Sequence, residues 1–195
     1  MEHGPVDTDQ VNTHGIVEPA VLEHAAKAVS ERTRWVDDFP TPGVRFADLT
    51  PVFADGPAFG AVITALAATA SGAELVAGVD ARGFLLGGGV ARELGVGVLA
   101  VRKAGKLPPP VHTCEYSLEY GTASIEIPGD SIRLDGRRVF VVDDVLATGG
   151  TLAATVRLLE DAGAEVVSVA VVTEIEALAG RARLAKYPLT AIVRI

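Results

Sequence analysis

Residues 139–151, which read Val-Phe-Val-Val-Asp-Asp-Val-Leu-Ala-Thr-Gly-Gly-Thr, combine the residue types of the chain that are best suited to chemistry. An apolar strand is followed by a short turn, and a helical pattern begins after the turn. A helix start presents unpaired N–H groups and the positive end of the helix dipole, which favour a bound phosphate. Glycines let the backbone come close to such an anion, and threonines add hydroxyl donors. The segment therefore predicts a phosphate site at Ala147, Thr148, Gly149, Gly150 and Thr151.

Two adjacent carboxylates, Asp143 and Asp144, end the apolar strand. They cannot serve the phosphate because like charges repel, but they can accept hydrogen bonds from sugar hydroxyls or lie near a metal ion. A ribose 5-phosphate needs both features. The alternative is a purely structural segment, in which Thr148 caps the helix after a buried strand. That alternative explains the threonine and the glycines but not the paired acids. The segment is not a P-loop, which needs Gly-Lys-Ser/Thr.

Strands and helices must alternate to position this segment. Apolar runs are found at 74–79, 96–101, 138–142, 165–173 and 189–193. Helical patterns begin at Pro19, continue through 59–66, and recur at 84–94 and 152–159. Continuous apolar strands separated by helices predict an α/β fold whose parallel sheet is covered on both faces. In such sheets, ligands bind beyond the carboxyl ends of the strands.

The composition fits one globular domain with an appendage. The chain has 195 residues, of which 49% are hydrophobic and 22% charged. We expect residues 1–17 to form a flexible polar tail and residues 18–195 to form the domain. The net charge of −8 argues against a duplex nucleic-acid partner. A single cysteine, Cys114, excludes an intrachain disulfide and a cysteine-based zinc site, and a cytoplasmic setting is expected. The charge-free stretch 56–73 is rich in alanine and predicts an amphipathic helix, not a membrane span.

Several segments carry a resemblance to a known family. Residues 139–151 resemble the phosphoribosyl pyrophosphate signature of the type I phosphoribosyltransferases. Four further segments resemble the adenine phosphoribosyltransferases among them and occur in the family's order. They are Asp-Phe-Pro-Thr-Pro-Gly-Val-Arg-Phe-Ala-Asp-Leu-Thr-Pro at 38–51, Gly-Val-Asp-Ala-Arg-Gly-Phe at 78–84, Arg-Lys-Ala-Gly-Lys-Leu-Pro at 102–108 and Tyr-Ser-Leu-Glu-Tyr-Gly at 116–121. The resemblance covers roughly residues 20 to 195. It implies the type I fold, a central mainly parallel sheet flanked by helices. It also implies a small hood near 38–50 and 174–190, and a flexible catalytic loop at about 103–124.

The resemblance also implies a reaction. Adenine and phosphoribosyl pyrophosphate would give AMP and pyrophosphate, as in purine salvage, with Mg²⁺ held mainly by the substrate and Asp143 as the candidate protein ligand. A homodimer in the cytoplasm is implied, with neither nucleic acid nor membrane as a partner.

Each site residue carried over has a role in that reaction. The catalytic residues would be Glu119, a general acid/base on the closing loop, and Arg82. The ribose would bind Asp143 and Asp144, and its phosphate would bind the turn at 147–151. Pyrophosphate would bind Asp80, Ala81, Arg82, Gly83, Arg102 and Lys106. Adenine would stack on Phe46, backbone groups around Arg45 and Ala47 would bind its edge, and Leu178 would close the other face of the base. The family often has a serine where Ala81 stands and an arginine where Ala47 stands, so both side-chain contacts would be missing.

Taken without the resemblance, several of these residues have simpler explanations. Arg82 could lie in a surface turn, and Phe46 could be an ordinary core aromatic. Glu119 could be one of the solvated glutamates of a hairpin, with Glu115 and Glu126. Two further functions remain open, a phosphoribosyltransferase for another purine and a non-catalytic sensor of phosphoribosyl pyrophosphate. The second would need a nucleic-acid surface, which the acidic composition opposes.

Overall fold

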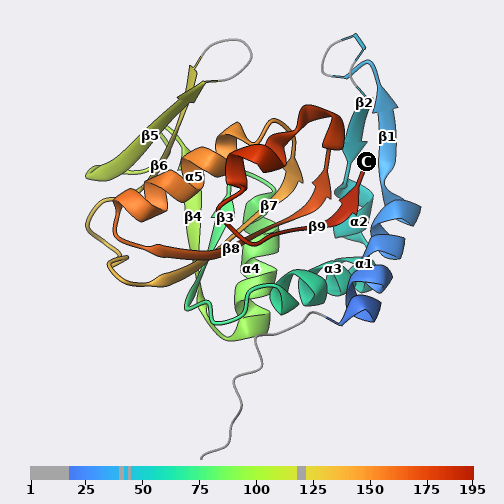
Figure 1. Cartoon of the computed structure of the whole chain (residues 1–195), viewed down its shortest axis with the longest axis horizontal. Helices are drawn as coiled ribbons and strands as arrows, with labels where there is room; N and C mark the ends of the chain where they lie inside the picture. The colour runs from blue at the N-terminus through green and yellow to red at the C-terminus, as the bar shows by residue number, and fades with distance from the viewer. Residues whose placement is uncertain (1–17, 40–41, 44, 118–121) are drawn as a thin grey trace, which may run out of the picture.

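The fold is built on a seven-stranded sheet, shown in Figure 1. In this computed structural model the described residues are 18–39, 42–43, 45–117 and 122–195. The strand order is β5-β6-β4-β3-β7-β8-β9. The strands are β3 (Leu75–Val79), β4 (Gly97–Lys103), β5 (Val111–Ser117), β6 (Thr122–Pro128), β7 (Arg138–Leu146), β8 (Glu165–Glu174) and β9 (Leu189–Arg194). Strands β4, β3, β7, β8 and β9 are parallel, whereas β5 and β6 pair antiparallel. The predicted mainly parallel sheet is confirmed.

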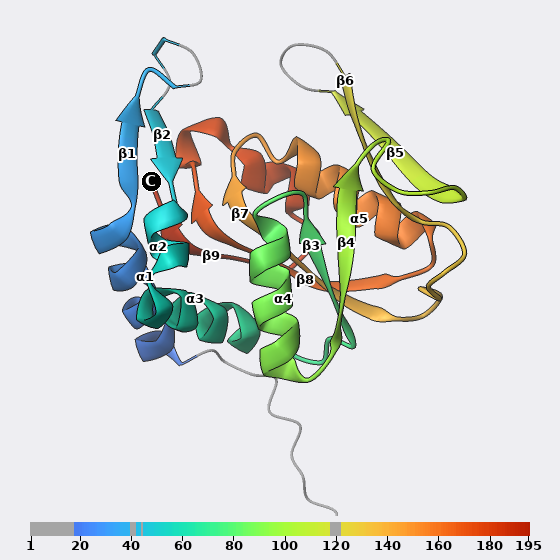
Figure 2. The same cartoon turned by 180° about the vertical axis from the view of Figure 1, so that it is seen from behind.

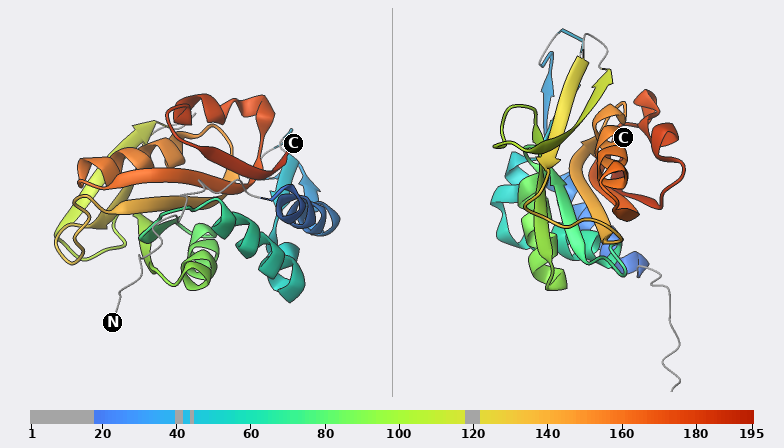
Figure 3. Two further views of the ribbon diagram at one scale, coloured as in Figure 1. Left: turned by 60° about the horizontal axis from the view of Figure 1, so that its bottom comes forward. Right: turned by 90° about the vertical axis from the view of Figure 1, so that its left-hand side faces the viewer.

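Helices cover both faces of this sheet (Figures 1 and 2). The helices are α1 (Pro19–Arg32), α2 (Thr50–Ala54), α3 (Gly56–Ala68), α4 (Gly83–Leu94) and α5 (Gly150–Asp161), with the short 3₁₀ helices η1 (Glu176–Leu178) and η2 (Gly180–Leu184). The tilted view of Figure 3 separates α1, α3 and α4 on one face from α5 on the other. Along β7, Val139 and Val141 join the core cluster that contains α5, while Phe140 and Val142 join the cluster of α1, α3 and α4. Burial on both faces explains why β7 is continuously apolar.

Glycine sets how closely α4 approaches the sheet. A Cβ on Gly78 of β3 would overlap the carbonyl oxygen of Gly83, and a Cβ on Gly87 would lie 3.2 Å from the Cα of Gly78. The helix therefore starts directly against the end of β3. It ends at Gly95, whose φ of 70° is left-handed, as expected for a helix stop.

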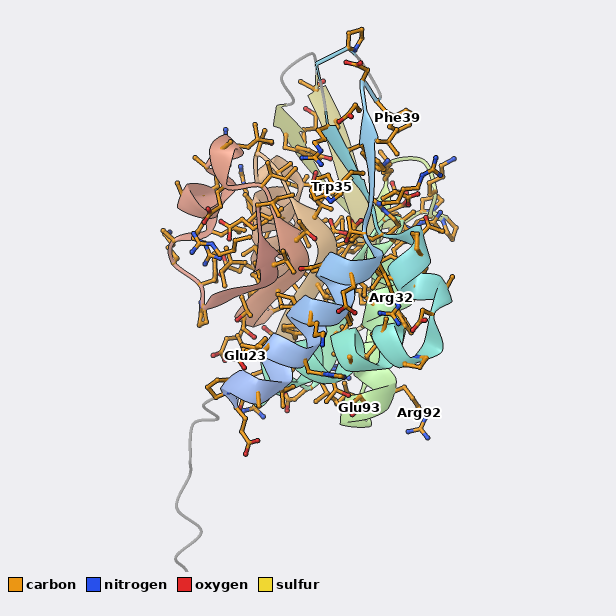
Figure 4. The ribbon with its side chains drawn as sticks, turned by 90° about the vertical axis from the view of Figure 1, so that its right-hand side faces the viewer. Glu23, Arg32, Trp35, Phe39, Arg92 and Glu93 are labelled. Atoms are coloured by element: carbon orange, nitrogen blue, oxygen red, sulfur yellow. The ribbon has the colours of Figure 1, made fainter. Side chains whose placement is uncertain are left out.

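A separate two-stranded sheet stands beside the main one. Strands β1 (Arg34–Asp37) and β2 (Arg45–Asp48) pair antiparallel, with Val36 opposite Phe46. Figure 4 shows Trp35 and Phe39 along this hairpin. It projects beyond the carboxyl edge of the main sheet, as does the β5–β6 hairpin on the opposite side (Figure 2). The hood expected near 38–50 overlaps the first hairpin in sequence, and the loop expected at about 103–124 overlaps the second; both roles stay predictions.

None of the helices in the described ranges combines the length and the apolar character needed to span a bilayer.

Candidate active site

The carboxyl ends of β3, β4 and β7 meet at one edge of the sheet, and the candidate site lies there. A cavity of about 560 Å³ is lined by residues from each of these strands, including Asp80, Lys103 and Asp143. Residues 123–125 of β6, Tyr116 of β5 and Thr151 of α5 also line it, and the Thr151 hydroxyl lies 3.2 Å from the Tyr116 hydroxyl. The position agrees with the rule that ligands bind beyond the carboxyl ends of parallel strands.

The predicted phosphate turn forms a smaller pocket at the same edge. A space of about 80 Å³ is lined by Asp143 and the continuous run 145–152. Helix α5 begins after Gly149, whose φ is 78°, and no side chain among the described residues caps it. The alternative that Thr148 caps this helix is therefore wrong. Because α5 starts uncapped, its first N–H groups are available to an anion.

The phosphate turn is packed against the segment before β9. A Cβ on Gly149 would lie 2.5 Å from the Gly180 carbonyl oxygen, and a Cβ on Gly180 would overlap the Ala147 carbonyl oxygen. The Ile175 N–H also donates to the Leu146 carbonyl at 2.9 Å. The turn thus has a rigid backing, to which Gly180 contributes. Sequence reasoning assigned this region to the hood and missed Gly180.

A buried carboxylate holds that backing in place. Glu174, at the end of β8, is only 2% exposed. It accepts hydrogen bonds from Arg181 Nε at 3.0 Å and Nη2 at 2.5 Å, and Arg194 Nε lies 3.3 Å away. Arg181 Nη1 also donates to the Leu189 carbonyl. The hydrogen bonds from Arg181 outweigh the effect of burial and lower the pKa of Glu174.

Replacing Glu174 by glutamine is expected to reduce stability at neutral pH by about 2 kcal/mol, because charge-assisted hydrogen bonds are lost. The folded-state pKa of Glu174 is lowered, so its contribution is present above the unfolded pKa and is lost as pH falls through the folded value. Urea unfolding between pH 7 and pH 3 should therefore show a smaller difference between wild type and variant at low pH. Glu165→Gln, at the exposed start of the same strand, is the control. An equal difference at all pH values would contradict this role.

The paired acids of β7 have different surroundings. Asp143 lines both cavities, and its Oδ1 accepts the Asp144 N–H at 2.8 Å. Burial, and next the charge of Asp144, raise the pKa of Asp143 well above its usual value. Asp144 instead forms a salt bridge with Arg82, with 2.6 Å between Oδ2 and Nε. That contact lacks hydrogen-bond geometry, so within the described residues Oδ2 is a buried acceptor without a hydrogen-bond donor.

The predicted pyrophosphate loop, 80–83, connects β3 to α4. Its Asp80–Ala81 peptide bond is cis. Asp80 accepts from Arg102 Nε at 3.0 Å, and the Arg102 guanidinium lies 5.4 Å from the centre of the Phe84 ring. A Cβ on Gly83 would lie 2.9 Å from the Val142 carbonyl oxygen. The loop therefore rests on β7, and Arg102 is paired with an acid of the same site.

The apolar part of the site lies under the β1–β2 hairpin. A cavity of about 420 Å³ is lined by Val36, Phe39, Phe46, Asp48, Thr50 and Arg82. Phe39 and Phe46 meet edge to face, with 5.1 Å between ring centres. The Arg82 guanidinium lies 5.5 Å from the centre of the Phe46 ring. Arg82 thus contacts both this apolar pocket and Asp144, which is predicted to bind the ribose.

Not every residue predicted to bind a base lines that pocket. Phe46 does so. Arg45 lies on the other face of β2 and stacks over Trp35 at 4.5 Å, whereas Ala47 is buried on that face. Leu178, in η1, is 42% exposed. Phe39 and Asp48 were not singled out, although two-residue alternation along β2 places Asp48 on the same face as Phe46.

Two further predictions concern the region after β4. Lys106 is exposed on the turn that follows this strand. Glu126 is only 4% exposed and accepts three backbone hydrogen bonds, so it is not one of a set of solvated glutamates. Glu119 lies outside the described residues, as do the tail at 1–17 and Val44.

Comparison with known proteins agrees with this geometry. Residues 53–192 match the model of the phosphoribosyl transferase domain. An adenine phosphoribosyltransferase of Rhodococcus jostii is 69% identical over 177 residues, covering 90% of this chain and all of the relative. The chain therefore belongs to the phosphoribosyltransferase family.

Two solved structures indicate which phosphoribosyltransferases this chain resembles. Adenine phosphoribosyltransferase from Thermoanaerobacter pseudethanolicus has a TM-score of 0.83 and 43% identity, and the match covers 87% of this chain and 99% of that one. The Saccharomyces cerevisiae enzyme, in a complex with adenine and an imino-altritol bisphosphate, has a TM-score of 0.81 and 34% identity, with coverage of 87% and 99%. Within its family, the chain groups with the adenine phosphoribosyltransferases.

Proposed function

We propose that this chain transfers the 5-phosphoribosyl group of phosphoribosyl pyrophosphate to adenine, giving AMP and pyrophosphate. One observation carries the proposal: Arg82 lies beside the Phe46 ring of the apolar pocket and also pairs with Asp144, one of the two acids that precede the phosphate turn. A ribose 5-phosphate seated on that turn would direct its C1′ toward a base in the apolar pocket. The yeast relative, which binds adenine together with a sugar bisphosphate, supports this arrangement.

Each part of the substrate has a chemically matched group. The uncapped start of α5 offers N–H donors to the 5-phosphate. Asp143 on the cavity wall suits ribose hydroxyls, and the neighbouring Asp144 is paired with Arg82. Phe39 and Phe46 offer ring surfaces to a purine. Arg82 provides positive charge beside the bond that breaks, where negative charge develops on the leaving pyrophosphate.

The bond changes define what the protein must do. The N9–C1′ bond forms as the C1′–O bond to pyrophosphate breaks, and that electron pair leaves with pyrophosphate. Adenine loses its imidazole proton in the same overall reaction, and we assign the acceptor role to Glu119. Closure of the surrounding loop would exclude water from the cation-like sugar.

Magnesium fits this site as a companion of the substrate. Among the described residues there is no group of three side chains placed to hold a metal ion. One carboxylate on the cavity wall, Asp143, suits an ion held mainly by substrate phosphates. Bound there, magnesium would neutralise charge on the leaving group.

We also propose that the protein is a homodimer and that it is located in the cytoplasm. Light scattering would test the first proposal, and cell fractionation the second.

Replacing Asp144 by alanine should weaken binding of phosphoribosyl pyrophosphate by about tenfold or more, because Arg82 loses its partner and the ribose loses an acceptor. Isothermal titration calorimetry measures this change. Asp161→Ala, at the exposed end of α5, is the control. Unaltered affinity in the Asp144 variant would count against the ribose assignment.

Replacing Phe46 by alanine should raise KM for adenine by about tenfold, with a smaller effect on phosphoribosyl pyrophosphate, because it removes the ring surface of the base pocket. Steady-state kinetics with each substrate varied in turn separates the two constants. Phe53→Leu is the control, because it removes an aromatic ring that does not line this cavity. Parallel changes in both KM values would argue against a base-binding role.

The function itself is tested by an assay of the purified protein with phosphoribosyl pyrophosphate, Mg²⁺ and each purine in turn. AMP from adenine, with little product from hypoxanthine, guanine or xanthine, is expected. Faster conversion of another purine would refute the base assignment. Binding of phosphoribosyl pyrophosphate without product from any purine would favour a non-catalytic sensor.

A further inference from the structure

Glu126 of β6 is a buried charged residue that the reaction described above does not use. Its Oε1 accepts the N–H groups of Lys106 and Leu107, both at 2.7 Å, and its Oε2 accepts the Gly105 N–H at 3.1 Å. The side chain is 4% exposed. A single carboxylate thus gathers three consecutive backbone donors from the turn after β4.

Those hydrogen bonds replace strand pairing that the turn cannot make. Ladder pairing of β4 with β6 ends at Lys103, opposite Ile125, and the Ala104 N–H then donates to the Ser124 carbonyl at 3.0 Å. Gly105 has a φ of 78°, so the chain turns sharply there. Beyond that point, within the part of the chain that the structure describes, hydrogen bonds to the Glu126 carboxylate connect the turn to β6.

The turn borders the candidate site. Lys103 and Ala104 line the 560 Å³ cavity together with Asp80 and Asp143. Lys106 follows two residues later, on the part of the turn that Glu126 holds. Glu126 also lies opposite Arg102 in the β4–β6 register, and Arg102 is bonded to Asp80. The carboxylate therefore organises the basic segment nearest the proposed pyrophosphate position.

Glutamate suits the binding of three backbone N–H groups better than the chemically similar glutamine and aspartate. Burial alone would raise the pKa of Glu126. The hydrogen bonds from Gly105, Lys106 and Leu107 together have a larger, opposite effect, so the pKa is lowered. The group is ionised at neutral pH and can accept all three bonds. A glutamine would keep one acceptor oxygen and would turn an NH₂ group toward a backbone N–H. An aspartate would be shorter by one methylene.

We propose that Glu126 is a positioning residue for pyrophosphate: it holds the 104–107 turn so that Lys106 is preorganised for the leaving group. The proposal rests on the proposed function, because the leaving group is defined by it. It predicts that Glu126 acts through Lys106 and not through overall folding.

A double-mutant cycle tests this. Glu126→Gln should raise KM for phosphoribosyl pyrophosphate by about tenfold, leave KM for adenine within about twofold, and preserve the circular dichroism spectrum. In a Lys106→Ala background the same change should add less than about twofold. Glu115→Gln, an exposed glutamate on the adjacent β5, is the control. If Glu126→Gln does not fold, Glu126→Asp takes its place in the cycle.

Two results would overturn the proposal: an equal effect of the Glu126 change with and without Lys106, or equal increases in both KM values. The cycle is also measured as affinity for inorganic pyrophosphate by calorimetry. Absence of AMP formation by the wild type would refute the proposed function alone. The pyrophosphate cycle would then decide about Glu126, with non-additivity supporting its role and additivity contradicting it.

Discussion

Replacing Glu119 by glutamine is expected to lower kcat for AMP formation by about 100-fold or more, with little change in the affinity for phosphoribosyl pyrophosphate. Glutamine keeps the size of the side chain but cannot accept the imidazole proton of adenine. The proton must then leave without a positioned base. Single-turnover measurements with both substrates saturating report this step separately from binding and product release.

The control for this variant is Glu115→Gln. Glu115 is an exposed glutamate of β5, four positions before Glu119 in the sequence, and it does not line the cavity. It should leave kcat unchanged. Unaltered turnover in the Glu119 variant, or an equal loss in the control, would remove the acid/base assignment.

Alanine at Gly149 is expected to weaken AMP binding by about 100-fold. Gly149 has a left-handed φ of 78°, and a Cβ there would lie 2.5 Å from the Gly180 carbonyl oxygen. The phosphate turn must therefore move away from its backing, which displaces the N–H donors at the start of α5. Calorimetric titration with AMP measures the loss.

Gly136→Ala separates this effect from ordinary backbone strain. Gly136 has a φ of 67°, and a Cβ there would have no atom within 4 Å. That variant should lose about 1–2 kcal/mol of stability and keep its AMP affinity. A Gly149 variant that binds AMP as the wild type does would show that the close approach to Gly180 is unimportant for the phosphate site.

Much of this fold could be predicted from the sequence because its strands are unambiguous. The run at 138–142 is apolar without interruption, and β7 is buried on both faces. The structure extends β7 through both acids to Leu146, and the glycines lie just beyond it, so their place near the carboxyl edge follows from the fold class. The strand, glycine-rich turn and helix start at 139–151 could be predicted for the same reason, since they are adjacent in the chain.

What could not be predicted depends on contacts between distant segments. Nothing near Gly180 in the chain indicates that its carbonyl faces Gly149. Glu115 and Glu126 look alike in the sequence, yet one is exposed and the other accepts three backbone N–H groups. The surroundings of Asp143 and Asp144 differ because Asp144 pairs with Arg82, which lies between β3 and α4.

The most direct test of the central claim, that residues 143–151 bind a ribose 5-phosphate, compares AMP with adenosine. The two ligands share base and sugar and differ only in the phosphate. Calorimetric titration of the wild type should show AMP binding at least about 100-fold more tightly, since several N–H donors would engage the phosphate. In Gly149→Ala, most of that advantage should disappear. Equal affinity of the wild type for AMP and adenosine would contradict the account.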